Sequence, residues 1–139
     1  MHAAIRTAAI LAFLFGAVHA QAADLTIRID NVDSNDGQLM VTLYKGAADW
    51  MKQPLQTASV EAVAGITTVQ FKDLPPGEYA FAVFHDANGN GRLDRNRMGM
   101  PLETYTFSND AQGFMGPAPF EAARFALPTA GRSMTVNLR

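Results

Sequence analysis

Residues 74–85 read LPPGEYAFAVFH, and this stretch decides the fold. Its first four residues predict a tight turn, because proline fixes φ and glycine permits a positive φ. From Glu78 to Phe84, alternate residues belong to opposite faces of a strand, and both faces are apolar. A strand of this kind is typical of a central position in a sheet, covered on both sides. We therefore expect this strand at the centre of the structure.

Short segments with period-2 alternation lie on both sides of this strand. The further predicted strands are residues 25–30, 39–43, 57–64, 66–71, 122–127 and 133–138. The turn-rich sequence of residues 31–37 predicts a hairpin between the first two. About seven short strands separated by turns predict an all-β fold, a single antiparallel β-sandwich.

Residues 1–23 are typical of a secretory signal peptide. Arg6 precedes the apolar run 7–18, and small-residue cleavage patterns ending at Ala20 or Ala22 follow it. The apolar run is shorter than the roughly 20 residues that a permanent membrane anchor needs. We expect residues 24–139 to form one exported domain, periplasmic or secreted, without membrane insertion after signal cleavage.

The composition excludes several classes of protein. The 139 residues include no cysteine and carry a formal net charge of −2, with 48% hydrophobic residues. Disulfide frameworks, thiolate metal sites and cysteine nucleophiles are therefore excluded, and a polycationic nucleic-acid binder is not expected. Once the signal peptide is removed, His85 is the remaining histidine.

Residues 86–94 (DANGNGRLD) match most of a calcium loop of the EF-hand type. Calcium takes six to eight oxygen ligands, and alternate residues of a tight loop direct their oxygens inward. The expected ligands are the side chains of Asp86, Asn88, Asn90 and Asp94 and the backbone carbonyl of Arg92.

Two features of the sequence weaken this match. Position 12 of the pattern, where calcium loops carry a bidentate Glu, is Arg97, and Arg92 and Arg95 add further positive charge. Glu103 supplies a third carboxylate if the chain folds back. With two carboxylates in the loop itself, we expect a dissociation constant of roughly 10⁻⁴–10⁻³ M. Two alternatives stay open: a series of Asx turns that holds no ion, and arginines that pair with the carboxylates.

Three motifs together resemble a known family. They are residues 74–94 with the pattern FHDxNGNGxLD, residues 99–109 ending in FSN, and residues 116–123 beginning with GPxxF. The chain resembles small exported bacterial proteins that form a domain-of-unknown-function family. The resemblance covers nearly all of residues 24–139 and implies a β-sandwich akin to prealbumin-like or collagen-binding-B-type modules, within the prealbumin/immunoglobulin-like class of sandwiches. It implies no established activity.

Residues 95–121 show no clear strand pattern and predict a long ordered loop that caps one end of the sandwich. This loop follows the 86–94 segment directly. A single cleft lined by His85, Asp86, Asp94, Glu103 and Tyr105 is therefore a further hypothesis.

The leading functional interpretation is a non-enzymatic exported binding or accessory module with a calcium-binding loop. Its expected partner is an envelope protein or a glycan. The first alternative is a copper carrier, because Met98, Met100 and Met115 lie in the long loop and thioether and imidazole ligands suit Cu(I). A hydrolase using His85 and Glu103 ranks third, since His85 shares the apolar face of the central strand and is better explained as a structural histidine.

Overall fold

The central strand is β5, Gly77–Asp86, as the sequence predicts. The computed structural model describes residues 22–139, and β5 pairs there with β2 (Gln38–Tyr44), β6 (Tyr105–Phe107) and β7 (Phe125–Leu127). β3, Gln56–Glu61, pairs with β2 and completes a five-stranded sheet. β5 therefore has neighbours along both edges.

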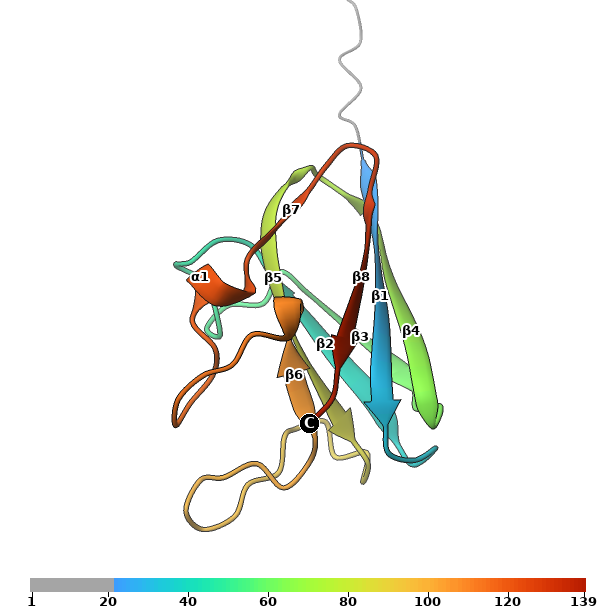
Figure 1. Ribbon diagram of the computed structural model, residues 1–139, viewed down its shortest axis with the longest axis vertical. Coiled ribbons are helices and arrows are strands. Elements are labelled where there is room, and N and C mark those ends of the chain that lie inside the picture. Colours follow the sequence, from blue (N-terminus) through green and yellow to red (C-terminus); the bar gives the residue numbers. More distant parts are fainter. Residues whose placement is uncertain (1–21) are drawn as a thin grey trace, which may run out of the picture.

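A three-stranded sheet packs against the five-stranded sheet (Figure 1). Its middle strand is β1, Ala23–Val32, which is antiparallel to β4 (Gly65–Leu74) and parallel to β8 (Arg132–Asn137). The alternation predicted for β1 is confirmed, because Leu25, Ile27 and Ile29 are fully buried between more exposed neighbours. The chain is thus nearly all β and sandwich-like.

Apolar side chains of both sheets fill the interior of the sandwich. Burial of each large side chain contributes about 1.5–3 kcal/mol relative to exposure. This packing stabilises a chain that has no cysteine for a disulfide. The interior cluster includes Leu25, Ile27, Ile29, Leu39, Val41, Leu43, Val69, Phe71, Tyr79, Phe81, Val83, Phe125, Leu127 and Val136.

A second apolar cluster covers part of the outer face of the five-stranded sheet. At its centre, the indole N–H of Trp50 donates to the carbonyl oxygen of Ala118 at 2.8 Å. The short helix α1, Phe120–Ala123, supplies further members. The cluster consists of Tyr44, Trp50, Ala80, Phe107, Ala118, Phe120 and Ala123. β5 is therefore covered on its inner face and over part of its outer face, where Ala82 and Phe84 stay half-buried, so the predicted coverage of both faces is confirmed in part.

The predicted hairpin of the first two strands is wrong, because β1 and β2 lie in different sheets. Residues 31–37 carry the chain from one sheet to the other. The apolar residues of both strands face the same interior, and a turn-rich segment alone does not distinguish this crossing from a hairpin. Gly37 passes so close to β5 that a Cβ atom there would lie 2.0 Å from the carbonyl oxygen of Asp86.

The purely antiparallel arrangement is also wrong. Residues 128–131 lead from β7 in one sheet to β8 in the other, where β8 runs parallel to β1. The segment 95–121 contains β6 and a short 3₁₀ helix, η1 (Ser108–Asp110). Each of these elements has three residues, which is too short for a periodic sequence pattern to predict it. Ala122 and Ala123, expected in a strand, belong to α1.

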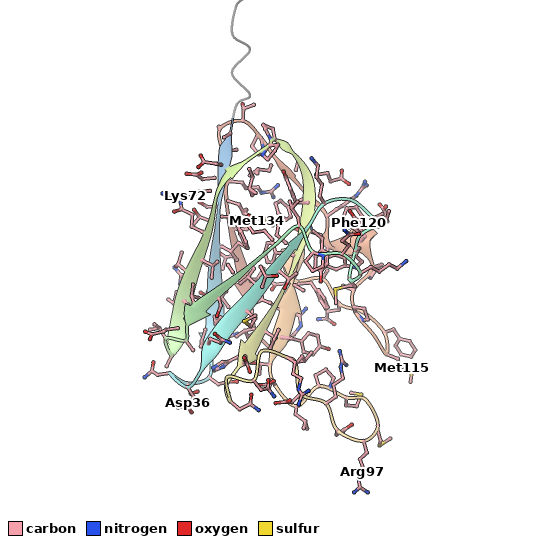
Figure 2. All side chains as sticks on the ribbon, turned by 180° about the vertical axis from the view of Figure 1, so that it is seen from behind. Asp36, Lys72, Arg97, Met115, Phe120 and Met134 are labelled. Carbon is pink, nitrogen blue, oxygen red and sulfur yellow. The ribbon has the colours of Figure 1, made fainter. Side chains whose placement is uncertain are left out.

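Two loops project from the sandwich instead of one cap. Figure 2 shows Arg97 and Met115 at the tips of these loops. Among residues 22–139, no helix is long and apolar enough to cross a membrane. The predicted signal peptide falls mainly on residues 1–21, outside the described residues. β1 begins at the buried residue Ala23.

Candidate functional site

The Asp86–Asp94 loop starts from a fully buried carboxylate. The antiparallel register places Asp86, the last residue of β5, opposite Gln38 on β2. The side-chain amide of Gln38 donates to Asp86 Oδ2 at 2.9 Å, and the backbone N–H of Gly91 donates to the same oxygen at 2.8 Å. The backbone N–H of Asn90 donates to Oδ1 at 3.1 Å. Asp86 therefore fixes the loop onto the sheet.

These contacts determine the protonation of Asp86. Burial raises the pKa of its carboxyl group, but hydrogen bonds from Gln38 and from the backbone amides of Gly91, Asn90 and Gly89 lower it by more in total. The net result is a pKa below the ordinary value for Asp. Asp86 thus carries its negative charge inside the protein at neutral pH.

The other polar side chains of the loop converge on Asp94. The amide group of Asn88 donates to Asp94 Oδ2 at 2.5 Å, and that of Asn90 donates to Asp94 Oδ1 at 2.7 Å. The tight course of the chain depends on Gly89 and Gly91, which have φ angles of 70° and 79°. Four of the predicted ligand side chains are therefore gathered in one small turn.

Backbone contacts of the two asparagines also fit the Asx-turn alternative. Asn88 Oδ1 accepts from the backbone N–H of Asn90 at 3.3 Å, and Asn90 Oδ1 accepts from that of Arg92 at 3.1 Å. These bonds hold the loop in shape without an ion. In this arrangement the side-chain oxygens of both asparagines are occupied by backbone N–H groups and their N–H groups face Asp94.

Glu103 closes the loop. Its Oε2 accepts from the backbone N–H of Ala87 at 2.9 Å, and its Oε1 accepts from that of Asp94 at 3.0 Å. The sequence leaves open whether Glu103 folds back toward the loop, and in the structure it does so. It contacts the two ends of the loop and leaves the centre to the asparagines and Asp94.

The arginines near the loop do not neutralise its carboxylates. Within residues 22–139, the ion pairs are Arg28–Asp30, Arg124–Glu78 and Arg124–Glu121, and none of them includes Asp86 or Asp94. The alternative of arginine pairing is therefore wrong. The part of the chain that the structure describes holds no group of three or more His, Asp or Glu side chains arranged to hold a metal ion. A cation in this loop would depend on two carboxylates together with amide and carbonyl oxygens.

The single cleft predicted around His85 is not formed. His85 is 3% exposed, and its Nε2 lies 2.7 Å from the carbonyl oxygen of Asp36, so the interpretation as a hydrogen-bonded structural histidine is confirmed. Tyr105 belongs to the opposite face of the sheet. The reason is the alternation along β5, which turns His85 toward the interior.

A cleft of about 490 Å³ lies instead on the outer face of the five-stranded sheet. Its floor consists of side chains from β2, β5 and β6, and its walls are residues 93–101 and 113–117. Met51, Met98, Met100 and Met115 all line it. The sequence pattern groups three of these methionines but misses Met51 and Tyr44, because Tyr44 ends β2 and Met51 lies in the segment that follows it, both far from the two loops in the chain. It also missed Gln38, whose role depends on the register of β2 and β5.

The comparison with protein families gives one match. Residues 27–136 match the model of a family described as "uncharacterized protein conserved in bacteria (DUF2141)". The expected membership in a domain-of-unknown-function family is thereby confirmed. No curated protein and no solved structure matches the chain.

Proposed function

The chain belongs to the DUF2141 family, and we propose that it is a non-enzymatic, exported binding module whose Asp86–Asp94 loop binds calcium. One observation supports the calcium proposal above the others. The side chains of Asn88 and Asn90 converge on Asp94 beside the buried Asp86, and no arginine in residues 22–139 pairs with either carboxylate. This is an oxygen-rich turn with two carboxylates that are hydrogen-bonded but not paired with a cationic side chain.

Calcium binding needs a small rearrangement of the loop. The two asparagine amide groups turn their oxygens toward the ion, which replaces their N–H groups beside Asp94. Asp86 and the backbone carbonyl of Arg92 complete the set. Two carboxylates give low affinity, with a dissociation constant of roughly 10⁻⁴–10⁻³ M. Such a site is occupied only where calcium is abundant, as it is outside the cytoplasm.

Export is the part of the proposal that rests on residues 1–23. Their charge, apolar run and small-residue end are those of a signal peptide. N-terminal sequencing of the mature chain checks it, and a chain from a cell envelope fraction that still begins at Met1 contradicts it. The partner that we propose is an envelope protein or a glycan.

Calcium is expected to raise the melting temperature. With a dissociation constant of about 1 mM, 10 mM calcium stabilises the folded chain by about 1.4 kcal/mol, which corresponds to about 5 °C. The isosteric variant Asp94→Asn is expected to lose most of this rise. Asp33→Asn, in an exposed turn, serves as the matched control and keeps the rise. Differential scanning calorimetry of EDTA-treated protein measures both, and equal rises in the two variants would contradict the proposal.

Copper transport is a second candidate function, favoured by the four methionines that line one cleft. Thioethers are ligands of Cu(I). Cu(I) uptake, measured by competition with a chromogenic chelator, is expected to fall at least tenfold in the Met98→Leu/Met100→Leu double variant. Met134→Leu, which lies against the interior cluster, is the control. Unchanged uptake in the double variant removes this candidate.

A further inference from the structure

We propose that the cleft on the outer face of the five-stranded sheet binds an elongated apolar carboxylate whose far end carries an oxygen. Its volume of about 490 Å³ lies within the range of about 300–1,000 Å³ that is typical of small-ligand sites. The inference deepens the proposed binding role, and it does not require calcium in the Asp86–Asp94 loop.

The floor of the cleft is a shallow channel along the strands. Ala82 of β5 pairs with Thr42 of β2 on one side, so two small side chains lie at the middle of the floor, and with Phe107 of β6 on the other side, whose ring borders them. One end is marked by Tyr44, which pairs with Ala80, and the other by Phe84. Four residues of strand separate these ends, a length of about 13 Å. A channel of this length fits an extended hydrocarbon chain.

Tyr44 places an unused polar group at one end of the channel. The residue is 6% exposed and lines the cleft, and its hydroxyl oxygen is not among the enclosed polar atoms of residues 22–139 that lack a partner, so it is open to the cleft. Its ring packs against Trp50, with a distance of 5.1 Å between ring centroids. Burial raises the pKa of Tyr44, which keeps the hydroxyl protonated. A ligand oxygen at this end would take the place of water as the partner of this hydroxyl.

Arg95 places a positive charge at the other end. It lines the cleft and follows the Asp86–Asp94 loop. Its Nη1 donates to the carbonyl oxygen of Gly99 at 2.9 Å, which orients the side chain, and no carboxylate in residues 22–139 pairs with it. A guanidinium group has five N–H donors, so enough remain for a carboxylate. The two polar ends and the apolar floor together select the ligand.

A fluorescent reporter lies beside the cleft, because Trp50, the single tryptophan of the chain, packs against two of its lining residues. Its ring is 5.1 Å from Tyr44 and 5.8 Å from Phe107, and both of these residues line the cleft. Trp50 fluorescence is recorded on the full folded domain in EDTA while dodecanoate, 12-hydroxydodecanoate or dodecanol is added below its aggregation limit. We expect saturable changes, with affinity rising from dodecanol to dodecanoate to 12-hydroxydodecanoate. Each step is expected to lower the dissociation constant about two- to tenfold, which corresponds to the free energy of one hydrogen bond.

Three variants test the parts of the cleft separately. Ala82→Leu fills the floor and is expected to weaken binding of all three compounds at least tenfold. Tyr44→Phe is expected to remove the preference for 12-hydroxydodecanoate over dodecanoate. Arg95→Gln is expected to remove the preference for dodecanoate over dodecanol. Arg97→Gln, on the same exposed loop but outside the cleft, is the matched control. Arg95 and Arg97 are exposed, so these two variants remain informative if Ala82→Leu does not fold.

Several results would overturn the inference. They are the absence of any saturable change, equal affinity in Ala82→Leu, and equal loss in the Arg95 and Arg97 variants. A Trp50 change with phosphatidylglycerol vesicles but not with the monomeric acids also overturns it, because it assigns the exposed loop tips to a membrane surface. None of these results affects the calcium titrations, so failure of the cleft proposal is distinguishable from failure of the calcium proposal.

Discussion

The Asp86→Ala variant is expected to lose about 2–3 kcal/mol of unfolding free energy. The substitution removes the acceptor of three hydrogen bonds from Gln38, Asn90 and Gly91, and donors left without partners cost about 1–3 kcal/mol where water does not replace the bond. The loss stays within this range although three donors are affected, because residues 89–91 are exposed and regain water. Urea denaturation measures the effect. Asp33→Ala, in an exposed turn, is the control, and a similar small loss in both variants would contradict the role assigned to Asp86.

The same carboxylate gives stability a predictable dependence on pH. In the folded chain the pKa of Asp86 is lowered, whereas an unfolded Asp titrates near about 3.9. The folded chain therefore binds fewer protons in this range, so the contribution of Asp86 is complete above the unfolded pKa and is lost as pH falls through the folded pKa. The difference in unfolding free energy between wild type and Asp86→Asn is expected to shrink from pH 6 to pH 2. A difference that is constant over this range would show that the carboxylate is not stabilised by folding.

The Ser108→Ala variant is also expected to lose about 2–3 kcal/mol of unfolding free energy. Ser108 is fully buried where β6 ends, and its hydroxyl oxygen accepts from the backbone N–H of Phe81 at 3.0 Å. The hydroxyl also donates to the carbonyl oxygen of Ala123 at 2.5 Å. Alanine leaves both backbone groups without a partner in the interior.

The effect of Ser108→Ala extends to the cleft, because β6 forms part of its floor. Loosening of β6 is expected to reduce binding of dodecanoate as well as the free energy of unfolding. Ser133→Ala, at an exposed position of β8, is the control for denaturation. A loss below about 0.5 kcal/mol in Ser108→Ala would mean that water or neighbouring groups satisfy both backbone partners.

The strands were predictable where apolar and polar residues, or two apolar faces, alternate over many consecutive residues. β5 and β1 each have ten residues; in β1 the apolar positions are the most buried ones, and in β5 no residue from Tyr79 to Asp86 is exposed. β6 was not predictable, since it has three residues and depends on pairing with Ala82 to Phe84 rather than on its own pattern. The pairing of β1 was not predictable either. Which sheet a strand joins depends on contacts between distant residues, and a turn sequence does not contain them.

The candidate site was likewise predictable only in part. The loop itself was predictable, because the ligand residues and glycines are consecutive and their spacing has a geometric meaning. The contribution of Gln38 was not, since it reaches Asp86 across a strand pair separated by 48 positions. The cleft was not predictable for a similar reason. Its floor and walls come from β2, β5, β6 and two loops, and only the fold brings Tyr44 and Arg95 to one surface.

Calcium titration followed by NMR tests the central claim most directly. The ¹⁵N-labelled domain, freed of metal with EDTA, is titrated to 10 mM calcium, with magnesium in parallel. The account predicts that amide resonances of residues 86–94 and Glu103 shift together and saturate with a dissociation constant of roughly 10⁻⁴–10⁻³ M. Resonances of β8, on the other sheet, are expected to stay unchanged. Shifts spread over exposed acidic residues without saturation, or no shifts in residues 86–94, would contradict the account.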